Sequence, residues 1–241
     1  MGNSYFQFKK FTVFHNCCTF KVGVDGVLLG AWADVEGITN VLDVGTGSGL
    51  IALMIAQRNC TAKIKAIDID NNSVLQAQEN FRNSQFSNRI SIKKIDFRKF
   101  LSKREKFDLV ICNPPFFVNS LQSPENKRNI ARHSVCLTHE ELLTNAKNLL
   151  TEEGKISIIL PLAEGEKAKN FAQKIGLALS RCTKVFPKEN MPAKRILLEF
   201  ILNKNNENQT LTEDFLLLET KQRGIYTKEY TELVKDFYLK M

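Results

Sequence analysis

The stretch Asp108-Leu-Val-Ile-Cys-Asn113-Pro114-Pro115-Phe116 decides the fold of this chain. Residues 107–112 form a short run of apolar and β-branched side chains, which is typical of a buried strand. The two prolines end the run, because proline has no N–H to donate to a sheet ladder. Asn113 is therefore expected at the carboxyl end of a central strand, where open α/β sheets bind their ligands.

Asn113 and Pro114 together offer two acceptors to one amine. The side-chain carbonyl of Asn113 and the backbone carbonyl of Pro114 can each accept a hydrogen bond from an NH2 group, while Phe116 offers a flat ring for stacking. An amine on a purine is a poor nucleophile, but two acceptors can turn its lone pair out of plane towards an electrophile. The alternative is that Asn-Pro-Pro forms only a turn. Its position after a strand and downstream of a glycine-rich loop favours the amine site.

Strand and helix patterns alternate along most of the chain, which predicts a parallel, doubly wound sheet. We predict strands at 38–44, 63–69, 90–95, 107–112, 156–160, 177–186 and 195–203. We predict helices at 24–33, 50–58, 71–84, 138–150 and 164–175. The fold class is therefore α/β, with a doubly wound, seven-stranded, mostly parallel sheet.

The ends of the chain extend this core. Aromatic and β-branched residues at 5–22 predict a hairpin, and the tail combines an apolar run at 215–218 with a final helix. We expect one domain over 1–241, made of an N-terminal extension (1–37), a catalytic core (38–203) and a C-terminal extension (204–241).

Three glycines follow the first core strand and lead into a helix. Gly45, Gly47 and Gly49 allow the backbone to turn tightly and to approach a ligand closely. The dinucleotide pattern requires glycine at position 50, where this chain has Leu. The acid at Asp43 would repel a pyrophosphate but would suit a sulfonium or an amino-acid ammonium. The alternative is a tight turn of the kind found in any α/β fold.

Acids also lie at the ends of the next two strands. Asp68 can accept hydrogen bonds from two ribose hydroxyls, or it can cap the following helix, a role that Asp70 fits better. Asp96 and Phe97 can read an adenine edge, with the carboxylate accepting from the amine and a backbone N–H donating to a ring nitrogen. Asp96 as a plain turn residue is an equally open alternative.

Net charge and cysteine spacing restrict the partners. The formal charge of +8 favours an acidic partner such as nucleic acid. The six cysteines show no C-x-x-C spacing, so we expect no metal site, and free thiols suit a reducing cytoplasm. No signal peptide or membrane-spanning run is recognisable. We therefore expect a cytoplasmic protein without a membrane partner.

Taken together, these motifs resemble the class I S-adenosylmethionine-dependent methyltransferases over residues 38–203. The Asn113-Pro114-Pro115-Phe116 turn is similar to that of the branch that methylates exocyclic amines of adenine or guanine, or a glutamine amide. The resemblance implies a Rossmann-like fold, S-adenosyl-L-methionine as cofactor, and Asn113, Pro114 and Phe116 as the residues that hold the target. It implies cofactor contacts from Asp25, Asp43, Gly45, Gly47, Gly49, Asp68, Asp96 and Phe97.

Three further segments resemble the bacterial valine-tRNA adenine-37 N6-methyltransferases: Phe20 to Trp32, Arg128 to His133, and Asp236 to Leu239. That family more often has Thr where this chain has Val24. The resemblance implies methylation of adenine 37 in the anticodon loop, with Asp25 helping to close the cofactor pocket. We expect the protein to act as a monomer. Asp25 as a helix N-cap is the alternative, and both roles can hold at once.

The same resemblance implies tRNA as partner, with basic residues near the site contacting its phosphates. The candidates are Lys127, Arg128, Arg132, His133 and Arg195. His133 could act as a general base, which this chemistry does not require. A target base leaves its stack more easily in a loop than in a duplex.

Three other functions remain open on the sequence. A glutamine methyltransferase acting on a release factor usually has Tyr in place of Phe116 and a separate N-terminal helical domain. A guanine-methylating rRNA enzyme often carries a duplicated domain. A non-catalytic RNA-binding module would not need the cofactor and amine motifs.

Overall fold

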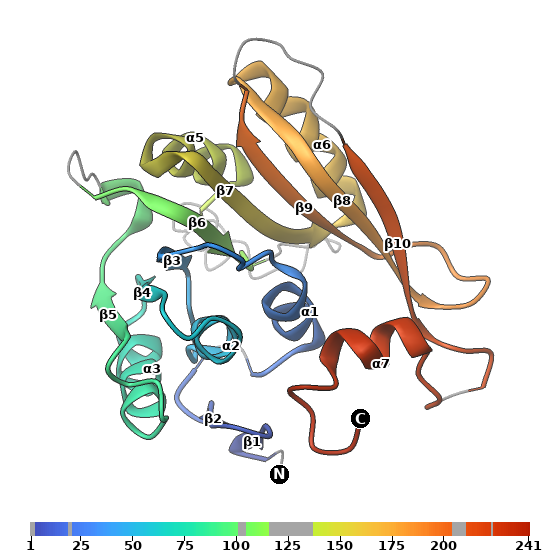
Figure 1. The fold of residues 1–241 in the computed structure, drawn as a ribbon, viewed down its shortest axis with the longest axis horizontal. Coiled ribbons are helices and arrows are strands. Elements are labelled where there is room, and N and C mark those ends of the chain that lie inside the picture. The colour runs from blue at the N-terminus through green and yellow to red at the C-terminus, as the bar shows by residue number, and fades with distance from the viewer. Residues whose placement is uncertain (1–2, 19–20, 101–104, 116–136, 204–210, 223) are drawn as a thin grey trace, which may run out of the picture.

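The computed structural model describes residues 3–18, 21–100, 105–115, 137–203, 211–222 and 224–241. Within these residues one large sheet has the strand order β10-β8-β9-β7-β6-β3-β4-β5 (Figure 1). Its strands are β3 (Asn40–Val44), β4 (Lys63–Asp68), β5 (Ile90–Lys94), β6 (Phe107–Cys112), β7 (Leu150–Pro161), β8 (Leu177–Lys188), β9 (Arg195–Leu202) and β10 (Thr212–Glu219). Strands β3 to β7 pair in parallel, and β9 is antiparallel to both of its neighbours. The predicted α/β fold is confirmed.

Helices cover both faces of the sheet, because successive strand residues point to opposite faces. Val41 and Leu109 belong to the cluster under α1, α2, α3 and α7, whereas Leu42 and Val110 pack under α5 and α6. The helices are α1 (Val24–Trp32), α2 (Leu50–Arg58), α3 (Asn71–Arg82), η1 (Phe97–Lys99), α5 (His139–Leu149), α6 (Leu162–Lys174) and α7 (Lys228–Val234).

Two parts of the sheet differ from the prediction. Strand β7 begins at Leu150, directly after α5, and not at residue 156. The tail contributes an eighth strand, β10, which pairs in parallel with β8. The sequence of β10 mixes acids with an apolar run, so only the free edge of β8 makes it a strand.

Helix α5 begins with a capping box, since the Thr138 hydroxyl accepts from the Glu141 N–H and the Glu141 carboxylate accepts from the Thr138 N–H. The prediction that Asp25 caps α1 is wrong. Gly23 is the N-cap, and Asp25 lies in the first turn. Glycine fits the extended backbone there but has no side chain to cap the helix.

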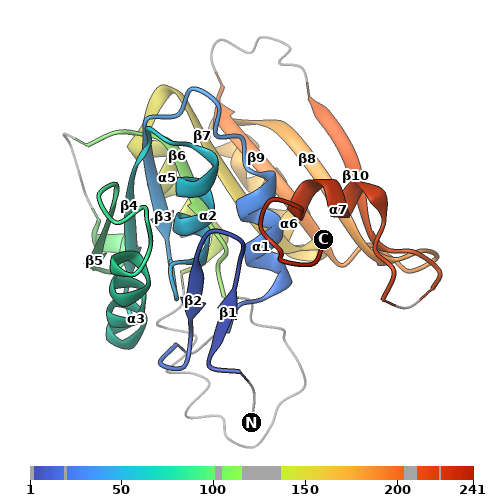
Figure 2. The ribbon, with the colours of Figure 1, turned by 60° about the horizontal axis from the view of Figure 1, so that its bottom comes forward.

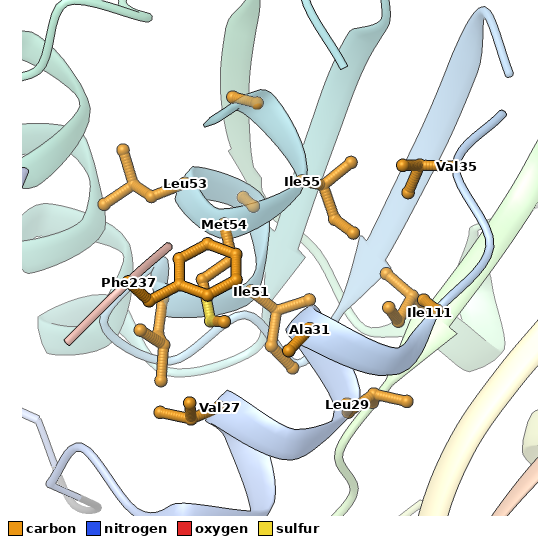
Figure 3. Packing of buried hydrophobic residues seen from close by; sticks show 14 of the residues in the cluster. Val27, Leu29, Ala31, Val35, Ile51, Leu53, Met54, Ile55, Ile111 and Phe237 are labelled. Atoms are coloured by element: carbon orange, nitrogen blue, oxygen red, sulfur yellow. The ribbon is translucent and has the colours of Figure 1, made fainter. Parts of the chain in front are cut away.

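The two ends of the chain pack together. The hairpin, β1 (Tyr5–Gln7) and β2 (Thr12–Phe14), is shorter than predicted and lies beside the C-terminal segment (Figure 2). The backbone N–H of Lys9 donates to the carbonyl of Phe237 at 2.8 Å. Phe237 is buried in the cluster formed by α1 and α2 (Figure 3). The C-terminal motif therefore has a structural role in holding the hairpin.

The buried amide of Asn80 joins the hairpin to the loop after β3. Its Oδ1 accepts from the Phe14 N–H at 3.0 Å, and its Nδ2 donates to the carbonyls of Phe14 and Ser48, both at 2.8 Å. All of its side-chain polar atoms are therefore satisfied in the interior, which makes the amide a specific link.

Gly165 tests how closely α6 packs on β9. A Cβ at Gly165 would lie 2.0 Å from Cγ2 of Ile196, a fully buried side chain. Alanine is the better helix former by about 1 kcal/mol, but overpacking a core costs about 1–3 kcal/mol. Because a separation of 2.0 Å is far inside van der Waals contact, we expect the overpacking cost to be about 2–3 kcal/mol, at the upper end of this range. After the gain in helix propensity, Gly165→Ala should lower the free energy of unfolding by about 1–2 kcal/mol, measured by urea denaturation.

The matched control is Lys167→Ala, on the exposed side of the same helix, which should change stability by less than about 0.5 kcal/mol. A Gly165→Ala variant as stable as the parent protein would show that the helix can move away from the sheet at no cost.

Candidate functional site

A cavity of about 560 Å³ lies at the carboxyl edge of the parallel strands. Its described walls come from the first turn of α1, the glycine loop after β3, and the residues that follow β4, β5 and β6. The volume is within the usual range for small-molecule sites, about 300–1,000 Å³. The predicted residues on the wall are Asp25, Gly45, Gly47, Asp68, Asp96, Phe97, Asn113 and Pro114.

The glycine loop needs glycine for two separate reasons. Gly45, Gly47 and Gly49 have φ of 67°, 56° and 84°, values that other residues rarely adopt. A Cβ at Gly45 or Gly47 would meet no described atom within 4 Å, so these two positions border open space. At Gly49 it would lie 2.4 Å from the Phe81 ring, so this glycine serves helix packing and is absent from the cavity wall.

Asp43 lies behind the glycine loop and not on the cavity wall. It is completely buried, and its Oδ2 accepts from the Thr46 hydroxyl at 2.6 Å and from the Ala52 N–H at 3.2 Å. Its Oδ1 has no hydrogen-bond partner among the described residues. Burial raises the pKa of Asp43 to about 7. Asp43 therefore shapes the loop and places a titratable charge beneath it.

Asp68 faces the cavity beside the loop. Its Oδ2 accepts from the Gly47 N–H at 2.8 Å, and its Oδ1 accepts from the Asp70 N–H at 2.9 Å. Burial raises its pKa, and these hydrogen bonds oppose that shift. Each oxygen keeps a further lone pair, so the carboxylate can still accept from two hydroxyls. The capping role falls to Asp70, whose side chain accepts from the Ser73 N–H.

Asp96 has a structural role in the turn after β5, as the sequence left open. Its side chain caps η1 by accepting from the Arg98 N–H. The Arg98 guanidinium also contacts both carboxylate oxygens, and these hydrogen bonds lower the pKa of Asp96. A hydrogen bond to an adenine amine would share this carboxylate with Arg98. Phe97 is buried at the cavity wall.

Asn113 presents an unused acceptor at the cavity. Its Oδ1 is shielded from solvent, yet it has no hydrogen-bond partner in the described part of the chain. Pro114 is buried beside it. An unpaired buried carbonyl costs about 1–3 kcal/mol, so a donor is expected to bind there.

Asp25 and Arg195 lie together, although the sequence assigned them to different ligands. The Arg195 Nε donates to Oδ2 of Asp25 at 2.8 Å, and Asp25 also borders the cavity. Arg195 is partly occupied by this ion pair. The predicted residues Phe116, Lys127, Arg128, Arg132 and His133 lie outside the described residues.

Sequence reasoning missed several residues of the wall. Ile69 and Ile95 follow β4 and β5, and Lys21 and Val22 precede α1. The signal was available for the two isoleucines, since each is the last residue of a predicted strand. The segment before α1 belongs to the Phe20–Trp32 resemblance, but it has no periodicity that would place it at the cavity, which it reaches through the packing of α1 on α2.

In the part of the chain that is described, no helix has both the length and the apolar character that a membrane crossing requires. No cluster of three or more His, Cys, Asp or Glu side chains there could hold a metal ion.

Comparisons with known proteins agree with this geometry. The model of the family described as "methyltransferase small domain" matches residues 27–173. The tRNA1(Val) (adenine(37)-N6)-methyltransferase of Parabacteroides distasonis is 46% identical over 242 residues, covering 100% of both chains. The protein of the same name from Bacteroides fragilis is 43% identical over 243 residues, again covering 100% of both.

The fold is also found among solved structures. A predicted O-methyltransferase from Agrobacterium tumefaciens has a TM-score of 0.69 at 20% identity, over 88% of this chain and 96% of that chain. A ribosomal protein L11 methylase from Lactobacillus delbrueckii has a TM-score of 0.53 at 19% identity, over 77% and 81%. These likenesses support the fold alone.

Asp43 makes folding stability depend on pH. Its pKa is about 7 in the folded protein and near 3.8 when unfolded, so the folded state holds more protons between these values. The contribution of Asp43 to the free energy of unfolding is therefore present at low pH and is lost as pH rises. The loss is at most about 1.4 kcal/mol per pH unit. We expect the stability of the parent protein relative to Asp43→Asn to fall between about pH 5 and about pH 7.

The control is Asp70→Asn. Hydrogen bonds from Ser73 lower the pKa of Asp70, so its contribution is constant over that pH range. Unfolding in urea at several pH values measures both. A difference between the parent and Asp43→Asn that does not change with pH would show that Asp43 is ionised throughout.

Proposed function

The chain belongs to the methyltransferase small domain family, and from this premise we propose that it methylates N6 of adenine 37 in valine tRNA, using S-adenosyl-L-methionine. It is 41–46% identical to curated proteins of that activity over 98–100% of its length. The observation that carries the chemistry is the unpaired Asn113 carbonyl beside the cavity.

The described residues fit the cofactor. Gly45 and Gly47 leave open space beside the loop backbone, and the Asp68 carboxylate retains lone pairs for two ribose hydroxyls. Ile69, Ile95 and Phe97 supply apolar surface for an adenine ring. When bound, S-adenosyl-L-methionine supplies an electrophilic methyl group on a positively charged sulfur.

Asn113 and Pro114 would orient the target amine. The Asn113 Oδ1 accepts one N6–H and the Pro114 carbonyl accepts the other, so the nitrogen lone pair points towards the methyl carbon. S-adenosyl-L-methionine, held beside Gly47 and Asp68, would supply the methyl group to this lone pair and would keep the electrons of the broken bond on its sulfur. The methylated nitrogen then releases one proton to water, and no strong base is needed.

The whole chain would act as one unit. Phe237, near the C-terminus, packs in the same buried cluster as Val27 and Met54 (Figure 3). We propose a single domain over 1–241 that works as a monomer on a tRNA. Mass spectrometry of nucleosides from tRNA incubated with the protein tests the activity, and N6-methyladenosine is the expected product. N2-methylguanosine, or a methylated glutamine in a release factor, would point to the other branches of the family.

Replacing Asn113 tests the amine site. Asn113→Ala removes one acceptor, so we expect kcat to fall at least about 100-fold, while the Kd for S-adenosyl-L-methionine stays within about twofold. Radiolabelled methyl transfer and calorimetry measure the two quantities. The control is Asn88→Ala at an exposed position, which should leave both unchanged. Undiminished turnover in Asn113→Ala would exclude the proposed role.

Asp68 tests the cofactor site separately. Losing hydrogen bonds to a charged group costs about 1.5–3 kcal/mol, so Asp68→Ala should weaken S-adenosyl-L-methionine binding about 10- to 100-fold. Asp214→Ala, on β10, is the control for removing a carboxylate. Equal affinity in the parent protein and Asp68→Ala would rule out the ribose contact.

A further inference from the structure

We propose that Arg195 is a positioning residue that acts through Asp25, and that it holds the first turn of α1 against Asn113. The inference rests on the proposed function, because it concerns the rate of the same methyl transfer. It replaces the expectation that Arg195 contacts RNA with a role inside the protein.

Helix α1 begins without a side-chain cap. Its N-cap is Gly23, and no side-chain hydrogen bond caps the helix. An uncapped first turn is prone to fray, because its N–H groups lack partners within the helix. The ion pair between Asp25 and Arg195 ties this turn to the rest of the protein at 2.8 Å. The negative charge of Asp25 near the helix N-terminus is also favourable.

The backbone of Arg195 is held in place by the large sheet. It is the first residue of β9, and that strand is paired on both sides, with Arg195 opposite Pro161 of β7 and Val185 of β8. Its Nη1 also donates to the Lys194 carbonyl at 3.2 Å. The side chains of Arg195 and Asp25 are 33% and 25% exposed, so the pair is partly shielded from water.

The first turn of α1 forms the wall behind the catalytic amide. A Cβ built at Gly26 would lie 3.8 Å from Nδ2 of Asn113 and 3.0 Å from Cδ2 of Leu50. Asn113 Oδ1 has no hydrogen bond to any described residue, so packing against this turn restricts how the amide can rotate. Asp25, one residue earlier, borders the same cavity.

Loss of the ion pair should therefore lower kcat more than it weakens binding. If the turn moves, the Asn113 carbonyl is no longer held in line with the target amine, and a displacement of about 1 Å can lower a rate about 100-fold. Phosphate contact would have another signature. It would weaken tRNA binding and reduce the slope of log Kd against log salt concentration by about one.

The test compares Arg195→Gln, Asp25→Asn and the double variant. We expect each single variant to lower kcat about 10- to 100-fold, with the Kd for tRNA and its salt slope unchanged. The double variant should be no slower than the slower single variant, because each single change already removes the Asp25–Arg195 ion pair. Arg195→Lys keeps the charge and should recover part of the rate. Lys174→Gln, an exposed charge on α6, is the matched control and should match the parent protein.

Amide hydrogen exchange measures the same coupling without turnover. Residues 25–27 should exchange faster in Arg195→Gln and in Asp25→Asn, but not in Lys174→Gln. Three results would each overturn the positioning role: unchanged amide exchange at residues 25–27, losses of kcat that add in the double variant, or a reduced salt slope of tRNA binding in Arg195→Gln. Suppose that residues 25–27 exchange faster in the two variants, as expected, but the parent protein methylates no tRNA. This result would overturn the proposed function, and the link between the ion pair and the first turn of α1 would still be supported.

Discussion

The register of β3 with its two neighbours is the constraint on which the site depends. Val44 lies opposite Ile67 of β4 and opposite Cys112 of β6. The next residue of the loop and of β4, and the residue that follows β6, are therefore Gly45, Asp68 and Asn113. Neighbouring strands are about 4.8 Å apart, so three groups from distant parts of the chain start within roughly 10 Å of one another. A shift of one residue in either pairing would turn the neighbouring strand's side chains to the wrong face.

The electrostatics of this edge complement a positively charged ligand. Asp43 is buried behind the loop, Asp68 is largely shielded beside it, and burial raises the pKa of both. The two carboxyls also repel each other, which contributes to the higher pKa of Asp43. A cation bound in the cavity would relieve this repulsion and favour ionisation of both groups. This preference agrees with a sulfonium cofactor and disagrees with a dinucleotide, whose pyrophosphate is an anion.

The sequence defined the core well, because each core element carries a local pattern. Residues 107–112 form the predicted central strand, and the acids at the ends of β4 and β5 lie at the cavity as expected. It predicted the glycine loop but did not separate its members: Gly45 and Gly47 border the cavity, and Gly49 makes room for Phe81. The sequence cannot distinguish a glycine that borders the cavity from one that makes room for packing. The need for glycine at position 49 arises from the Phe81 side chain on α3, which is distant in sequence.

What the sequence alone determined is the chemistry at each strand end, since Asn113, Asp68 and the glycines stand at the ends of apolar runs, and such runs predict buried strands. What only the tertiary structure decided is how elements far apart in sequence meet. Asp25 pairs with Arg195 across 170 positions, β10 adds to the free edge of β8, and Phe237 enters the core under the hairpin. These contacts depend on how α1 and the C-terminal segment pack on the assembled sheet. Local periodicity does not predict which surfaces from distant parts of the chain will meet.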